Sequence, residues 1–134
     1  MNRTLELLSS LLAIATAVWL GCASCPLAAT PGQSTFTSPE DAADTLARAA
    51  RSDDVTALRA IFGTMSDKLL FSGDRIADRA QLQRFATAYD EKHALSQDGD
   101  GRIVLSVGAN DWPLPMPIVR DGTSWRFDTQ AGAQ

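Results

Sequence analysis

The residues best suited to acid–base chemistry are D-E-K-H at positions 90–93, which include the only histidine of the 134-residue chain. A histidine oriented by a neighbouring carboxylate can serve as a general base near neutral pH. The alternative is structural, because His93 follows Tyr89 by four residues and a cation is favourable at a helix C-terminus. We favour the structural role, since no second histidine is present to complete a metal site.

A second candidate is the polar and aromatic corner formed by Asn110, Asp111 and Trp112, where an expected sheet turns. Two polar side chains and an indole at such a corner can line a ligand pocket, together with Trp125 and with His93. In the alternative, Trp112 closes one end of the core while the two polar residues form the turn. Both interpretations stay open at the level of sequence.

Asp74 and Asp78 are one helical turn apart, so their carboxylates could work as an acid–base pair. Each also has a simpler use. Asp74 is suited to cap the helix that follows it, and Asp78 can pair with Arg75 or Arg79. We favour the simpler use because aspartate is so common at helix N-termini.

Residues 98–103, D-G-D-G-R-I, resemble the middle of a calcium-binding loop. In that register the last ligand position falls on Val107, which cannot coordinate an ion, so we predict a glycine-rich turn. The chain also lacks a G-x-S-x-G elbow and a phosphate-binding loop. The sequence therefore predicts no catalytic residue, no metal site and no cofactor.

Two helices are predicted to position the first half of the chain. The first begins with S-P-E-D at residues 38–41, where serine caps free N–H groups and proline suits the first helical position. Its inward face is formed by Ala43, Leu46, Ala47 and Ala50, which are mostly small residues that allow close packing. The second begins at Asp53-Asp54 and ends near Gly63, with an inward face of Val55, Leu58, Ile61 and Phe62.

The third and most regular helix is predicted from Gly73-Asp74 onward. Its residues divide into an inward set (Leu82, Phe85, Ala86 and Tyr89) and a set that faces water (Gln81, Arg84, Thr87 and Glu91). The apolar stretch 68–72 before this helix lies between turn signals and is a candidate strand.

The rest of the chain has a β pattern. Residues 103–107 alternate, and D-G at 121–122 predicts a hairpin turn into a return strand with Trp125 and Phe127 on one face and Ser124, Arg126 and Asp128 on the other. The three prolines between 113 and 117 predict a protected sheet edge.

This order predicts an α+β fold, with three helices packed on one face of a small antiparallel sheet. The fold is similar to the nuclear-transport-factor-2-like cone, whose last strands often carry a comparable D-G-x-x-W-x-F pattern, here at residues 121–127.

The N-terminus has the pattern of a secretory leader, with Arg3, an apolar run over residues 7–20 and a small-residue exit. We predict a signal peptide over residues 1–29, a flexible tether over 30–37 and one domain over 38–134. The expected location is periplasmic or secreted, with a lipoprotein anchored at Cys22 as the alternative.

The charge and the hydropathy of the chain bear on two kinds of partner, nucleic acid and membrane. The formal net charge is −4, with acidic and basic residues interspersed, so nucleic acid is not expected as a partner. We also expect no stable membrane span once the leader is removed.

The chain resembles a bacterial family of exported proteins, domain-of-unknown-function family 2950. The motifs that carry the resemblance are A-Y-D-E-K-H at 88–93, G-D-G-R at 99–102 and D-W-P at 111–113. The resemblance implies export and an unassigned function, and it brings no established catalytic residues. Family members continue into a second region of similar length, so the chain is expected to correspond to their N-terminal half as a truncated or minimal version.

Two hypotheses of function follow. The first is an exported, non-enzymatic domain that acts as an envelope-associated interaction or accessory module for an unknown protein or small-molecule partner. The second is a cone-fold small-molecule binder or hydrolase with a pocket near Trp112 and His93.

Overall fold

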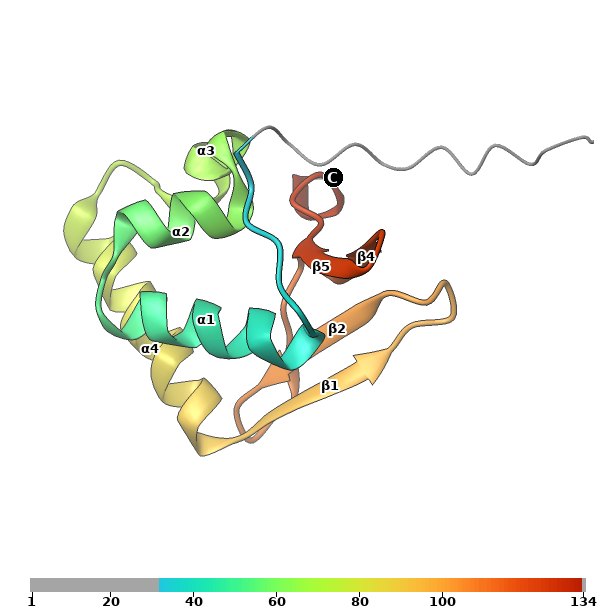
Figure 1. Ribbon diagram of the computed structural model, residues 1–134. Coiled ribbons are helices and arrows are strands. Elements are labelled where there is room, and N and C mark those ends of the chain that lie inside the picture. The colour runs from blue at the N-terminus through green and yellow to red at the C-terminus, as the bar shows by residue number, and fades with distance from the viewer. Residues whose placement is uncertain (1–31, 134) are drawn as a thin grey trace, which may run out of the picture.

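Helices and sheet lie side by side in this protein, with the helices gathered on one side of the sheet (Figure 1). The computed structural model describes residues 32–133, so the predicted leader and Cys22 lie outside the described residues. The helices are α1 (Pro39–Arg51), α2 (Val55–Phe62), α3 (Asp67–Leu70) and α4 (Arg75–Glu91), with 3₁₀ turns at Thr64–Ser66 and Ala131–Ala133. The strands are β1 (His93–Gln97), β2 (Ile103–Val107), β3 (Trp112–Pro113), β4 (Ile118–Asp121) and β5 (Ser124–Phe127).

The sheet is antiparallel, with strand order β1-β2-β4-β5, and the short β3 also pairs with β2. The predicted α+β class is therefore confirmed, and the three expected helices correspond to α1, α2 and α4. In the described part of the chain, no helix has the length and apolar character needed to cross a membrane.

Helix α1 begins where the sequence predicts, because Ser38 Oγ accepts a hydrogen bond from the Asp41 N–H at 3.1 Å. Its inward face is almost entirely alanine, with Ala42, Ala43, Ala47 and Ala50 at 1% exposure or less. Small side chains let neighbouring backbones approach closely, so α1 packs against both α4 and β5.

Three phenylalanines join the helices to the sheet. The rings of Phe62 on α2 and Phe127 on β5 have centroids 5.1 Å apart, and Phe36 meets Phe127 edge-on at 6.2 Å. Phe62 and Phe127 are almost completely buried, so this cluster forms the centre of the core.

The described part of the segment predicted as a tether is packed onto the domain. Phe36 pairs with Trp125 through two backbone hydrogen bonds, and it extends the sheet beside β5. The side-chain amide of Gln33 donates to the carbonyl oxygens of Ile61 and Phe127. The ordered fold therefore begins before residue 38, because apolar and amide groups here join α2 to β5.

The candidate strand at residues 68–72 is wrong, because residues 67–70 form the helix α3. Gly63 ends α2 at φ 81°, and a 3₁₀ turn then leads directly into α3, so the apolar residues are wound into a helix. The strand assignment depended on length and flanking turn signals, and a single short helical turn satisfies both.

A strand that the sequence pattern does not indicate follows α4. The helix ends at Glu91, and His93, which was expected to extend the helical face, is instead the first residue of β1. Strand β1 pairs with β2 over its whole length, from His93 opposite Val107 to Gln97 opposite Ile103. The turn at residues 98–102 that joins them is the predicted glycine-rich turn, with the Gly101 N–H donating to the Asp98 carbonyl.

The proline-rich run does not form one edge strand. Pro113 lies opposite Ser106, but Ile118 lies opposite Ile103, so two extra residues are accommodated in a bend between them. Because β4 pairs with both β2 and β5, the run leads into the interior of the sheet rather than along a free edge. The D-G hairpin turn is confirmed, with Gly122 and Thr123 between β4 and β5. Arg126 on β5 is buried, as is Phe127.

Helix α4 is fixed to the sheet near its C-terminus. The N–H of Gly108 donates to the carbonyl oxygens of both Ala88 and Lys92, at 3.1 and 2.8 Å. Gly108 has φ 79°. Glycine adopts this conformation at little cost, whereas other residues are strained in it. A glycine at this position therefore permits the contact between α4, β1 and the end of β2.

We expect Gly108→Ala to lower the free energy of unfolding by about 1–2 kcal/mol, because alanine is strained at this positive φ. An added Cβ would lie 3.5 Å from the Ala88 Cβ, an ordinary contact distance, so the cost comes from the backbone. Urea unfolding measures the change. Gly99→Ala is the control, since Gly99 has no positive φ and open space around it. Equal stability of the two variants would contradict this account.

Candidate functional site

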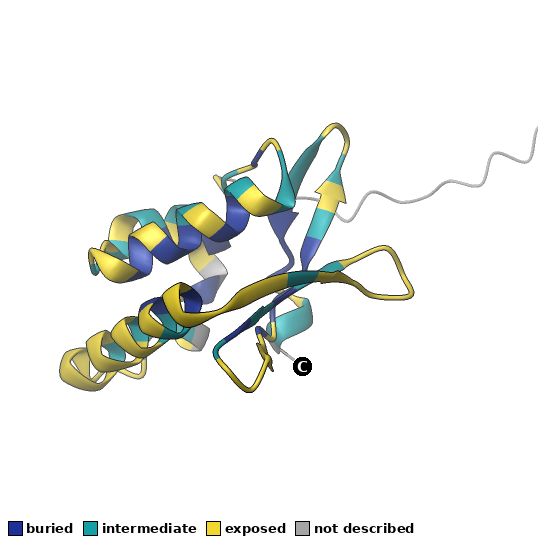
Figure 2. Cartoon of the chain, turned by 90° about the horizontal axis from the view of Figure 1, so that it is seen from below, coloured by how far each residue is buried: buried dark blue, intermediate teal, exposed yellow. Residues whose placement is uncertain are grey.

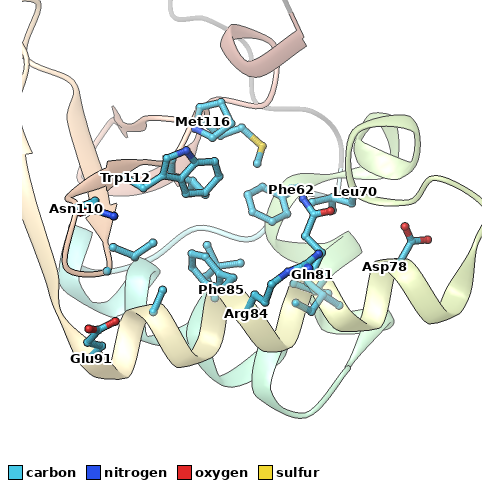
Figure 3. Close-up of a pocket in the computed structure, with 18 of the residues that line it drawn as sticks. Phe62, Leu70, Asp78, Gln81, Arg84, Phe85, Glu91, Asn110, Trp112 and Met116 are labelled. Carbon is cyan, nitrogen blue, oxygen red and sulfur yellow. The ribbon is translucent and has the colours of Figure 1, made fainter.

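A cleft of about 840 Å³ runs along α4, between this helix and the segment from the end of β2 to Met116 (Figure 3). Its floor is apolar and comes from Leu46 on α1 and from Leu58 and Phe62 on α2. Cavities of roughly 300–1,000 Å³ with mainly apolar walls are typical of small-molecule sites. The cleft therefore has the size and lining of a ligand site.

The cleft exists because α4 meets the sheet only near its C-terminal end. The junction at Gly108 holds that end, and α4 continues away from it along the cleft. The cleft is lined from Asp78 to Glu91, which is more than three turns of the helix. At the start of α4, Ile76 is 84% exposed, so the first turns of this helix lack a full covering.

The opposite wall is built by the turn between β2 and β3 and by the bend after β3. Asp111 adopts φ 49° in that turn. The next residue, Trp112, begins β3 and pairs with Val107 of β2. The Leu114 N–H still donates to the Leu105 carbonyl at 2.7 Å, after which the chain bends through Pro115 and Met116. This path places Trp112 and Met116 over the cleft (Figure 3).

Figure 3 shows how the two walls face each other. Trp112 and Met116 lie across from Phe85 on α4, and the buried Phe62 lies toward Leu70. Trp112 is 56% exposed. A single exposed apolar side chain is common, but Trp112 continues the apolar surface of a cleft, and contiguous apolar surface of this kind marks interaction sites. An indole, a thioether and a phenyl ring around one space provide polarisable surface for an apolar ligand.

Polar groups border this apolar surface, and most come from α4. They are Asp78, Gln81, Arg84 and Glu91 on the helix, and Asn110 on the facing turn. Arg84 forms no ion pair with any other residue that the structure describes. The lining set contains neither histidine nor cysteine, and its ionisable groups are the carboxylates of Asp78 and Glu91 and the guanidinium of Arg84.

Two of the five predicted site residues, Trp112 and Asn110, line the cleft. Asp111 is beside them in sequence but forms an ion pair with Lys92 at 2.7 Å, Oδ1 to Nζ. Trp125 lies on β5, where its ring accepts a cation–π contact from Arg120 at 5.2 Å. Neither Asp111 nor Trp125 lines the cleft. Of the predicted polar and aromatic corner, the residues at the cleft are therefore Asn110 and Trp112.

His93, the predicted general base, also lies outside the cleft. Its ring stacks on the ring of Tyr89, with centroids 3.9 Å apart and planes within 3° of parallel. Its Nδ1 is 2.9 Å from the Tyr89 carbonyl oxygen. These contacts join β1 to the last turns of α4, which is a structural role of the kind that the sequence favoured.

Tyr89 in turn joins α4 to α1, because its hydroxyl donates a hydrogen bond to Asp44 Oδ1. Burial, and then the hydrogen bond to Asp44, raise the pKa of the Tyr89 hydroxyl well above its ordinary value. The hydroxyl therefore keeps its proton throughout the neutral range and ties the two helices together.

The two aspartates near the start of α4 do not form an acid–base pair. Asp74 caps the helix, as predicted, by accepting hydrogen bonds from the N–H groups of Ile76 and Ala77. Asp78 was expected to pair with Arg75 or Arg79, but it accepts hydrogen bonds from the N–H and the hydroxyl of Ser72. Arg79 lies instead 3.8 Å from Asp53. Across residues 32–133, no cluster of three potential metal-ligating side chains is found.

The residues that sequence reasoning missed are those of the α4 wall. Gln81, Arg84 and Glu91 were assigned to water, and they are exposed, but they also border the cleft. Leu82 and Phe85 were expected in the core, yet both are only partly buried because the cleft opens beside them. The helical pattern gives no signal that one of its apolar positions faces an opening.

Fold and site together define a small α+β domain that carries an open apolar cleft. The chain belongs to the family described as "Protein of unknown function (DUF2950)", whose model matches residues 33–134. No curated protein and no solved structure matches the chain significantly. Family membership therefore brings no assigned activity to the cleft.

We expect Asp78 to make the stability of the fold depend on pH. Hydrogen bonds from the Ser72 N–H and then from its hydroxyl lower the pKa of Asp78 below its ordinary value. The stabilisation is therefore present above the unfolded pKa of about 3.9 and is lost as the pH falls through the lower folded value. Thermal unfolding of the protein and of Asp78→Asn should differ at pH 7, and this difference should shrink between pH 5 and pH 3.

The control for this experiment is Asp100→Asn, at the tip of the β1–β2 hairpin, which should change the melting temperature little at either pH. A difference between the protein and Asp78→Asn that stayed constant from pH 7 to pH 3 would contradict the assignment.

Proposed function

We propose that this chain is an exported, non-enzymatic binding domain, and that its cleft binds a small apolar molecule. The observation that carries this proposal is the set of facing side chains Phe85, Trp112 and Met116 around a cleft of about 840 Å³. Covering apolar surface with a ligand that displaces water is favourable by roughly 25 cal/mol per Å² buried. The hydrophobic effect therefore favours a ligand in the cleft.

The contacts favour binding over hydrolysis. A hydrolase would need a base within hydrogen-bonding reach of a bound substrate. His93 stacks on Tyr89 and Asp111 pairs with Lys92, and neither His93 nor Asp111 lines the cleft. Two carboxylates do line it, those of Asp78, which accepts hydrogen bonds from Ser72, and of Glu91. The other polar residues of the lining are Gln81, Arg84 and Asn110. Their amide and guanidinium groups are suited to orient a polar end of the ligand.

The fold and the leader support the rest of the proposal. A sheet with its helices gathered on one side and a cleft between the layers suits the similarity to the nuclear-transport-factor-2-like cone. That similarity concerns fold, and the proposed function depends on the cleft itself. The leader pattern at residues 1–29 supports export to the periplasm or the exterior, with anchoring at Cys22 as the alternative.

The neutral apolar fluorophore N-phenyl-1-naphthylamine tests the cleft directly. Titrated with the purified protein, it should show saturable fluorescence enhancement, because its emission rises in apolar surroundings. Trp112→Ala should weaken binding about tenfold, which corresponds to about 1.4 kcal/mol of lost contact free energy.

Trp125→Ala is the matched control, since it removes a half-buried indole that does not line the cleft. It should leave the affinity for the fluorophore within about twofold, because the two sites share no contact. Equal weakening in both variants, or no saturable enhancement in the unmodified protein, would overturn the assignment of the cleft as a ligand site.

A further inference from the structure

We propose that the free edge of β1 joins two copies of this chain into a two-fold symmetric dimer, by antiparallel strand pairing centred on Leu95. β1 is the terminal strand of the sheet order, and β2 is its one partner among the described strands. Figure 2 shows it as an exposed strand that reaches out to its hairpin loop. The outer side of β1 is therefore available to another strand.

The hydrogen bonds to β2 show which backbone groups face outward. The Gly108 N–H donates to the Lys92 carbonyl, and the Asp98 N–H donates to the Arg102 carbonyl, both at 2.8 Å. Orientation alternates along an antiparallel ladder, so Ala94 and Ser96 also direct their backbone groups toward β2. The N–H and C=O groups of His93, Leu95 and Gln97 therefore point away from the sheet.

No hydrogen bond from another described residue satisfies these outward backbone groups. Natural edge strands are usually protected from pairing by lysine, proline, a bulge or a cover. Strand β1, with the sequence H-A-L-S-Q, contains neither lysine nor proline, and its register with β2 has no bulge. Four of its five residues are exposed, and Leu95 is partly buried, so the edge is both open and unprotected.

The sequence around Leu95 is complementary to its own reverse. When two copies pair antiparallel about Leu95, Lys92 of each copy lies opposite Asp98 of the other, because both are three residues from the centre. Within the strand, His93 meets Gln97 and Ala94 meets Ser96, so no like charges face each other. This charge complementarity at both ends of the strand selects a second copy of the chain as the partner.

The geometry of the two faces agrees with this register. In β1, Leu95 and His93 lie opposite the buried Leu105 and Val107, so the odd-numbered residues face the core side of the sheet. Lys92 and Asp98 are even-numbered, so their side chains lie on the solvent face. Because their backbone groups point toward β2, they form a non-hydrogen-bonded pair across the new interface, where side chains approach most closely. Lys92 is 50% exposed in its ion pair with Asp111, so its ammonium group can also reach a carboxylate of the second copy.

The test is a charge exchange followed by sedimentation velocity over a range of protein concentrations. The unmodified protein should dimerise reversibly. Lys92→Asp alone and Asp98→Lys alone should each raise the dissociation constant about tenfold, because each places like charges opposite one another at both ends. The double variant with both changes should restore the original constant within about threefold.

A second variant tests the backbone contact independently. Gln97→Pro removes an outward N–H and no hydrogen bond to β2, so it should give a folded monomer with an unchanged far-ultraviolet circular dichroism spectrum. A protein that is monomeric at 500 µM would overturn the proposal. A dimer that persists in Gln97→Pro, or one whose charge variants are not rescued by the exchange, would overturn it equally.

Discussion

The contact at Gly108 is the constraint on which the arrangement of this domain depends. One N–H donates to two carbonyl groups, those of Ala88 and Lys92, and so fixes the end of α4 against the end of β2. This attachment lies where β1 leaves α4 and begins to pair with β2. It also leaves the rest of α4 beside the sheet rather than upon it, which creates the cleft.

The elements that could be predicted from the sequence are those defined by local signals. Ser38 and Asp74 cap α1 and α4 as expected, because an N-cap needs only a side chain within three residues of its partner. Strand β1 was missed because H-A-L-S-Q lacks the β-branched and aromatic residues typical of strands. Pairing with β2 makes it a strand, and that contact depends on the Gly108 junction rather than on local preference.

The sequence indicated the residues of only one of the two cleft walls. The D-W-P motif indicated an aromatic corner, and Trp112 does project over the cleft. Sequence could not show that His93 would stack on Tyr89, nor that Phe85 would face an opening, because both depend on how far α4 stands from the sheet. What distinguishes Trp112 from Trp125 is therefore tertiary placement, and the proposed function depends on that difference.

The measurement that tests this account most directly is the amide and indole NMR spectrum of the ¹⁵N-labelled protein during titration with N-phenyl-1-naphthylamine. We expect shifts in the indole signal of Trp112 and in amides of both cleft walls, from Gln81 to Ala88 and from Val107 to Met116. The indole signal of Trp125 should stay unchanged. Shifts confined to Trp125 and its neighbours, or no shifts at saturating probe, would contradict the claim that the cleft beside α4 is the binding site.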